Sequence, residues 1–204
     1  MNDKQENGES LPGASDAGDS DAQRMKLDAE WITRVLAGDT AQFQPLMEAH
    51  QQPIFAYLYR LLNGNVETAQ DLTQTVFLKA FQNLAGFDRS RLFRPWLYRI
   101  AHNEAANHLR GLSRRHEVAV EPATLNALGV SAGENPEQAQ SRADDRERVQ
   151  NALQGLPEKY REVLLLYYFE DRGYEEMAEI LNKNPRTVAT LLRRARQKLQ
   201  ALLE

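Results

Sequence analysis

The chain of 204 residues has no cysteine, only four histidines and no long apolar run. Without cysteine it can form no disulfide, no thiol nucleophile and no cysteine-ligated zinc site, and scattered histidines leave little metal chemistry. The longest apolar run, Val163 to Phe169, has seven residues, whereas a membrane-spanning helix needs about 20. No signal-like segment opens the chain. We therefore expect a soluble protein of the cytoplasm with no metal and no other cofactor.

Acidic residues exceed basic ones only near the N-terminus. The net charge is −4, and the first 24 residues alone hold six acidic and two basic side chains, which accounts for the whole imbalance. In the rest of the chain the charges are segregated. Residues 89–116 hold seven arginines against Glu104 alone, and residues 183–203 hold six basic residues and no acidic one. Two basic segments on a neutral body indicate nucleic-acid binding.

The distribution of apolar residues divides the chain into four segments. Residues 1–24 carry almost no large apolar side chain, which predicts a disordered acidic tail. Residues 25–116 and 143–204 show apolar residues at helical spacing, which predicts a larger and a smaller helical domain. Residues 117–142 contain two prolines and two glycines without sustained periodicity, which predicts a flexible linker. No segment resembles a strand, so the expected fold is all-α, with two small helical domains.

Turn residues and prolines set the expected helix boundaries. The helical pattern that starts at Leu27 breaks at Gly38, and Pro53 is expected to kink or divide the helix that follows. Pro95 in a first turn predicts a later helix that ends near Arg110. Between them, residues 67–84 are expected to bury one stripe, formed by Ala69, Leu72, Val76, Phe77, Ala80, Phe81 and Leu84.

Residues 174–199 have the spacing of a helix-turn-helix motif. Ala178 is small where two helices cross, and Asn182 can take the left-handed conformation of a tight turn. A solvated basic helix with no partner is the alternative, which the lack of acidic residues at i+4 disfavours. The second helix presents these residues to solvent or DNA: Arg186, Thr187, Thr190, Arg193, Arg194, Arg196 and Lys198.

Aromatic and basic residues occur together over residues 92–110. Asparagine is a poor helix former, so two of them beside arginines favour amides that read base edges, with surface or helix-bridging amides as the alternative. Trp96 either stacks on an unpaired base or belongs to the core. The polar face of this segment carries Arg99, Asn103, Asn107 and Arg110.

The helix expected over residues 67–84 has a second face opposite its apolar stripe. A strip that mixes apolar and polar side chains is typical of a protein-docking surface, and a merely solvated face is the equal alternative. The strip consists of Asp71, Gln74, Thr75 and Leu78.

In this order the three patterns resemble the extracytoplasmic-function (ECF) sigma factors, the minimal sigma subunits of bacterial RNA polymerase. The resemblance covers about residues 27–203. It is strongest in residues 69–80, in residues 96–103, and in Leu156-Pro157 with residues 160–163 ahead of the helix-turn-helix. Because these motifs are collinear, the resemblance does not depend on any one of them.

The resemblance implies that residues 25–116 form a sigma region 2 domain, which binds the polymerase clamp helices through Asp71, Gln74, Thr75 and Leu78. This domain would open the minus-ten element and capture a flipped base in a loop. The implied minus-ten contacts are Asp88, Arg89, Ser90, Arg91, Leu92, Arg99, Asn103, Asn107, Arg110, Arg114 and Arg115. Residues 143–204 would form a region 4 domain that reads the minus-thirty-five element and meets the polymerase flap.

The resemblance also implies the partners. These are core RNA polymerase, promoter DNA and an anti-sigma factor, often membrane-bound, with no small-molecule substrate. The chain is not expected to be an enzyme, because nucleotide addition belongs to the polymerase. In the absence of polymerase, a flexible linker lets the two domains fold back on each other or be held by an inhibitor.

The sequence departs from the family pattern at several positions of the helix-turn-helix, and two other function classes are alternatives to a sigma factor. Ala189 and Leu191 stand where arginine is common, so the promoter sequence cannot be taken from relatives, and Gly173 gives its helix no side-chain cap. The main alternative is a free-standing helix-turn-helix regulator that never contacts polymerase. An enzyme acting on nucleic acid is disfavoured because the sequence pairs no histidine with a carboxylate cluster. His102, His108 and His116 lack such partners, and His102 and His108 are expected on the helix surface or against phosphate.

Overall fold

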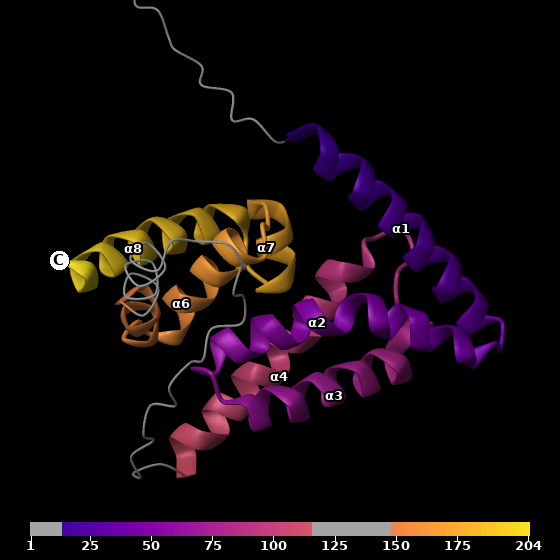
Figure 1. Ribbon diagram of the computed structural model, residues 1–204, viewed down its shortest axis with the longest axis horizontal. Helices are drawn as coiled ribbons and strands as arrows, with labels where there is room; N and C mark the ends of the chain where they lie inside the picture. The colour runs from indigo at the N-terminus through magenta and orange to yellow at the C-terminus, as the bar shows by residue number, and fades with distance from the viewer. Residues whose placement is uncertain (1–13, 116–147) are drawn as a thin grey trace, which may run out of the picture. The chain divides into compact units, whose positions relative to one another are not determined.

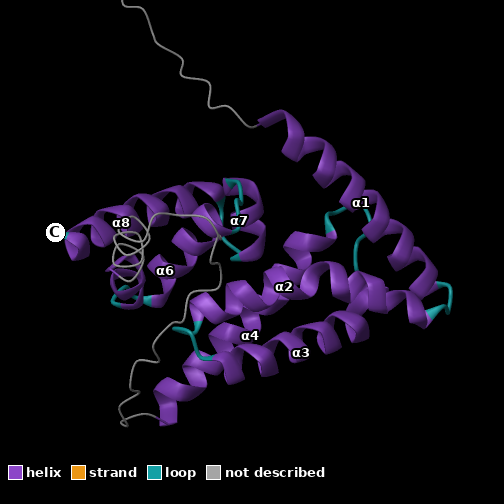
Figure 2. Ribbon diagram, in the orientation of Figure 1, coloured by secondary structure: helices purple, strands orange, loops and turns teal. Residues whose placement is uncertain are grey.

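The structure, a computed structural model, describes residues 14–115 and 148–204 (Figure 1). Every regular element within these two ranges is a helix (Figure 2), which confirms the all-α class. The described residues form two compact units that divide between Leu46 and Met47. The predicted linker over residues 117–142 lies outside the described residues, as does the first part of the predicted tail.

The first unit contains helix α1, Ala14–Leu36, and a 3-10 turn η1, Thr40–Gln42. α1 starts inside the segment that the sequence predicts to be a disordered tail. A helix that has formed over its apolar part adds further residues at little cost, and the stretch before that part contains three alanines. The predicted break after α1 is confirmed at Gly38, whose φ of 105° favours glycine, and Arg34 pairs with Asp39 across the turn at 3.3 Å.

Helix α2, Phe43–Leu61, is not divided at Pro53. Proline removes one backbone hydrogen bond, but apolar residues on both sides of Pro53 continue the buried stripe and hold the helix together. Leu46, Ile54 and Leu58 are each fully buried. Of the two expected effects of Pro53, a kink or a division, the division is therefore wrong, because packing of the stripe outweighs the lost bond.

Helix α3, Val66–Asn83, lies close to its predicted bounds. The side chain of Asn65 caps its start by accepting a hydrogen bond from the Thr68 amide at 2.9 Å. Most of the predicted stripe is buried, but Leu72 is only half-buried and Phe81 is 40% exposed. The expectation that Phe81 belongs to the core is therefore corrected. Its position is three residues after Leu78, on the second face of the helix.

A 3-10 turn η2, Leu84–Gly86, leads to helix α4, Phe93–Arg115, which packs on α3. Lys79 of α3 reaches Glu104 of α4 at 2.7 Å. α4 continues past Arg110, the predicted end, through a glycine of low helix propensity. Trp96 is half-buried, with its ring 5.0 Å from Phe87 and 5.5 Å from Phe93, which favours the core interpretation over base stacking.

The C-terminal part contains a helical stretch over residues 148–154 and four further elements. These are helix α6, Glu158–Leu164, the π-helical turn η3, Leu165–Phe169, helix α7, Tyr174–Ile180, and helix α8, Pro185–Leu203. α6 and α7 both pack on α8 (Figure 1).

The predicted helix-turn-helix is formed by α7 and α8. Asn182 takes the left-handed conformation expected of it, with φ of 50°. Asn184 caps α8 by accepting a hydrogen bond from the Thr187 amide at 2.8 Å, so α8 begins at Pro185. Met177, Ile180, Val188 and Leu192 are buried between the two helices and their neighbours. The motif thus has a continuous apolar core.

Candidate DNA-binding and protein-binding surfaces

The outer face of α8 is polar and basic, while its inner face is buried. At about 100° per residue, Val188, Leu192 and Ala195 fall on one side of the helix, and all three are buried. Each residue assigned to DNA contact is exposed: Arg186, Thr187, Thr190, Arg193, Arg194, Arg196 and Lys198. The motif core therefore holds this basic face outward.

The α8 side chains on the basic face are not equivalent. The guanidinium carbon of Arg196 lies 5.0 Å from the ring centre of Tyr167 and 5.4 Å from that of Tyr168. The Lys198 ammonium lies 5.7 Å from the ring of Tyr160. Both cations flank the centre of the face and make cation–π contacts within the C-terminal helices. The centre of the basic face is formed by Arg186, Thr190, Arg193 and Arg194.

The polar face of α4 contains two exposed asparagines in different states. Asn107 accepts a hydrogen bond at 2.7 Å from Arg110, so its amide oxygen is already used within the helix. Asn103 is exposed, and Arg99 is half-buried. The helix-bridging interpretation thus applies to Asn107 and leaves Asn103 as the amide presented to solvent. The backbone of α4 continues through Arg114 and Arg115, whose side chains lie outside the described residues.

The loop before α4 is exposed and internally braced. Asp88 accepts hydrogen bonds from the Ser90 amide at 3.0 Å and from the Ser90 hydroxyl at 2.7 Å, and these bonds lower the pKa of its carboxyl. The guanidinium of Arg91 lies 3.5 Å from Asp88 and 3.2 Å from Glu179 of α7. Arg89 and Leu92 are exposed. The loop therefore has a defined shape, in which Arg89 is exposed and Arg91 is paired with two carboxylates.

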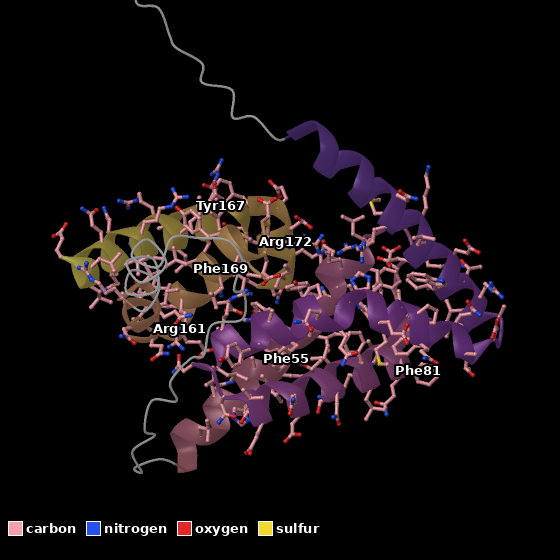
Figure 3. The ribbon with its side chains drawn as sticks, viewed as in Figure 1. Phe55, Phe81, Arg161, Tyr167, Phe169 and Arg172 are labelled. Carbon is pink, nitrogen blue, oxygen red and sulfur yellow. The ribbon has the colours of Figure 1, made fainter. Side chains whose placement is uncertain are left out.

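The second face of α3 is exposed along its length. Asp71, Gln74 and Leu78 are exposed, Leu78 by 57%, whereas Thr75 is half-buried and donates its hydroxyl proton to the Asp71 carbonyl at 2.9 Å. Phe81, labelled on α3 in Figure 3, extends this face. Sequence reasoning missed Phe81 because it fitted the spacing of the buried stripe equally well. The face combines apolar and acidic groups, as protein-docking surfaces do.

Two buried carboxylates connect the C-terminal helices to α2 and α4, and sequence reasoning missed both. Glu162 of α6 accepts a hydrogen bond from the Tyr57 hydroxyl at 2.6 Å and lies 2.5 Å from His102 Nδ1. Glu170, which follows η3, accepts a hydrogen bond from the Tyr98 hydroxyl at 2.5 Å and pairs with Arg60 at 3.2 Å. His102 is thus half-buried against a carboxylate, which corrects the expectation that it faces solvent or phosphate.

Burial sets the protonation of these groups. It raises the pKa of Tyr57 and of Tyr98 well above the ordinary phenol value, with the nearby carboxylates adding to the effect. Burial also raises the pKa of Glu170, against the opposing effects of Tyr98 and Arg60. The sequence signal for this cluster was an acidic residue at each end of the apolar run from Val163 to Phe169.

Arg161 adds a third connection to α2. Its guanidinium donates to the Leu61 carbonyl at 3.1 Å, to the Asn63 side chain, and to the Leu156 carbonyl at 3.1 Å. Arg161 is labelled in Figure 3. The C-terminal end of a helix favours a cation, because its last carbonyls point outward unpaired.

The described part of the chain contains neither a metal-binding group nor a membrane-spanning helix. Within residues 14–115 and 148–204, no three His, Asp or Glu side chains are grouped so that they could hold a metal ion. None of the helices in these ranges combines the length and apolarity needed to cross a membrane.

Comparisons with known proteins match both helical parts. Residues 46–115 match the family described as Sigma-70 region 2, and residues 146–199 match Sigma-70, region 4. The chain is 33% identical to the ECF RNA polymerase sigma factor SigW of Bacillus subtilis, over 84% of this chain and 94% of the relative. It is also 33% identical to the RNA polymerase sigma-H factor of Pseudomonas aeruginosa, over 88% of this chain and 95% of the relative.

Solved structures share the fold. CnrH, in complex with the cytosolic domain of CnrY, superposes with a TM-score of 0.62 and 25% identity, covering 87% of this chain and 97% of that chain. The sigma factor RpoE of Bartonella quintana, in complex with the anti-sigma factor NepR, gives a TM-score of 0.60 at 24% identity, covering 79% of this chain and 96% of that chain.

Proposed function

The chain belongs to the ECF sigma factors of RNA polymerase, and from this premise we propose how its surfaces divide the work of transcription initiation. As a sigma factor it binds core RNA polymerase, directs it to specific promoters and helps to melt the minus-ten element. The observation that carries the proposal is the pairing of an exposed docking face on α3 with an outward basic face on α8. A free-standing regulator is not favoured, because it needs no region 2.

Core polymerase is proposed to dock on the second face of α3. Asp71 and Gln74 provide polar contacts, while Leu78 and Phe81 provide apolar area that is exposed in the free chain. An exposed apolar pair rimmed by polar groups is what a protein interface requires, since the apolar pair loses its contact with water on binding. Thr75 is half-buried, and its hydroxyl is bonded to the α3 backbone, so we expect it to contribute less to polymerase contact than the exposed residues of this face.

The minus-ten element is proposed to bind the loop of residues 88–92 and the polar face of α4. Extruding a base costs a few kcal/mol, which contacts to the separated strand must offset. The loop is already braced by Asp88, so little ordering entropy is lost when it receives a base. Asn103 is the amide available to a base edge, and Arg89 and Arg91 are placed for phosphates.

The minus-thirty-five element is proposed to bind the basic face of α8. The first residues of a recognition helix enter the major groove, which assigns base contacts to Arg186, Thr187 and Thr190. Arg193 and Arg194, one to two turns later, are then placed beside phosphates. In this proposal the chain makes and breaks no covalent bond and is therefore not an enzyme. It acts in the cytoplasm, where the polymerase acts.

A protein inhibitor is also proposed. CnrH, which covers most of this chain, was solved with the cytosolic domain of CnrY bound to it. We expect an anti-sigma factor of the same kind to hold this chain. Because CnrY has a separate cytosolic domain, we expect this inhibitor to be tethered to a membrane.

The test of the proposed function is promoter-directed transcription together with capture of core polymerase. Wild-type protein mixed with core enzyme is expected to form a stoichiometric complex and to yield a defined transcript. Asp71→Arg is expected to abolish complex formation without unfolding the protein, because Asp71 is exposed on α3. Glu30→Arg, the same charge change on an exposed residue of α1, is the matched control. Normal binding by the Asp71 variant would show that the docking face is misplaced.

A further inference from the structure

We propose that Glu162 and Glu170 form a polar latch, which holds α6, α7 and α8 against α2 and α4 in the free protein and opens when core polymerase binds. The inference rests on the proposed function, because opening matters only if the two parts must reach separate promoter elements. The latch concerns the protein without polymerase, and membership of the family does not by itself say which residues connect the two parts in that state.

The latch consists of bonds that cross between the two sigma parts. Both partners of Glu162, Tyr57 and His102, and both partners of Glu170, Tyr98 and Arg60, come from α2 or α4. The two carboxylate side chains are each only 6% exposed. A buried carboxylate requires such partners, so the interface is specific to one arrangement of these helices.

The interface between the two sigma parts contains polar groups that water can hydrate when the helices separate. When the helices separate, each carboxylate and each hydroxyl exchanges its partner for water, so opening leaves no polar group buried and unpaired. The closed state also contains an opposing element. Arg172, which lies over the Tyr98 ring at 5.4 Å, is 5% exposed, and within the described residues its Nε and Nη2 have no hydrogen-bond partner. Opening hydrates those donors and so removes part of the cost of separation.

The closed arrangement is incompatible with binding both promoter elements. Their names place the elements about 25 base pairs apart, roughly 85 Å at 3.4 Å per base pair. α8 itself is 19 residues long, or about 29 Å. With Tyr57 and Glu162 in direct hydrogen bond, the two sigma parts cannot lie 85 Å apart. The latch must therefore break before both elements are occupied.

The latch overlaps one proposed DNA surface and leaves the polymerase surface free. Glu179 of α7 lies 3.2 Å from Arg91, where a phosphate is proposed to bind, while Asp71, Gln74 and Leu78 on α3 stay exposed. The closed protein can therefore dock on polymerase through α3 first, and Arg91 becomes available to DNA when α7 moves away.

The experiment measures the distance between the two sigma parts in the full-length free protein. Because the chain has no cysteine, Gln52→Cys on α2 and Gln197→Cys on α8, both exposed, accept a spin-label pair without further changes. Tyr57→Phe with Tyr98→Phe removes both hydroxyl donors and keeps both rings. Tyr59→Phe, on the same helix and in ring contact with Phe55, is the matched control.

Wild type and the Tyr59 control are expected to show a short, narrow distance. The double variant is expected to shift the closed-to-open ratio about tenfold or more for each lost donor. In complex with core polymerase it is also expected to bind a promoter with both elements more tightly, because less of the protein is closed. Glu162→Gln with Glu170→Gln, changed on the other side of the interface, is expected to shift both readouts the same way, with circular dichroism reporting the fold of each variant.

Unchanged distances in both pairs of variants, or a long distance in wild type, would overturn the latch while leaving transcription by the wild type intact. Failure of the wild type to direct transcription would instead overturn the proposed function, and the distances would still report on the latch.

Discussion

The hydroxyl of Tyr57 donates a hydrogen bond to Glu162 at 2.6 Å, although the two residues are 105 positions apart in the sequence. Tyr57 is a core residue of α2, and Glu162 is a buried acidic residue of α6. The pair connects the part that matches Sigma-70 region 2 to the part that matches region 4. A hydrogen bond between residues so far apart in the sequence joins α2 to α6.

Asn103→Ala is expected to reduce opening of the minus-ten element, with affinity for duplex DNA unchanged. Asn103 presents a free amide, whereas the amide oxygen of Asn107 already binds Arg110, so Asn107→Ala is expected to have the smaller effect. Permanganate reactivity of promoter thymines in the complex with polymerase measures the open fraction. Equal defects in the two variants would contradict the distinction.

Arg194→Ala is expected to weaken DNA binding across sequences and to lower the slope of log affinity against log salt by about 0.9, the value of one phosphate contact. Arg196→Ala is expected to change the slope less, since its guanidinium is held over Tyr167 and Tyr168. Binding titrations at several salt concentrations, with the complete polymerase complex, measure both slopes. A larger slope change for Arg196 would place that side chain on a phosphate instead.

Leu192→Ala is expected to destabilise the folded protein by about 2–5 kcal/mol, because it empties a fully buried site between α7 and α8. Leu202→Ala, on the same helix but 50% exposed, is expected to cost less than about 1 kcal/mol. Denaturant unfolding measures the free energy of unfolding of both variants. A small loss at Leu192 would mean that the core of the motif can close around the cavity.

Stability is expected to fall with rising pH through the titration of Glu170. Burial raises its pKa, against the opposing effects of Tyr98, Arg60 and Arg94, so the folded protein keeps a proton that the unfolded chain releases. The stability from this group is fully present below the unfolded pKa of about 4.3 and is lost as pH rises through the raised folded pKa.

Urea unfolding at a series of pH values from about 4, near the ordinary carboxyl pKa, to about 8 tests this dependence. Glu170→Gln is expected to lose the fall in stability with pH, and Glu175→Gln, on an exposed residue of α7, is expected to keep it. An identical pH dependence in wild type and Glu170→Gln would show that another group titrates.

The local features of the fold were predictable, since they depend on neighbours in sequence. The left-handed turn at Asn182, the break at Gly38 and the burial of Met177 and Val188 follow from conformational preference and helical spacing. The basic face of α8 was predictable for the same reason. Sequence reasoning failed where two faces fitted equally well, as for Phe81, or where packing outweighed a helix breaker, as at Pro53 in α2.

By itself the sequence determined the helices, the helix-turn-helix and the segregation of basic residues, because each of these arises from residues within a few turns of one another. Only the tertiary structure decided the partners of Glu162, Glu170 and His102, and which of two asparagines keeps a free amide. A buried carboxylate needs a partner, but many distant tyrosines and arginines satisfy that need equally. The choice among them depends on how helices pack in three dimensions, which no local spacing encodes.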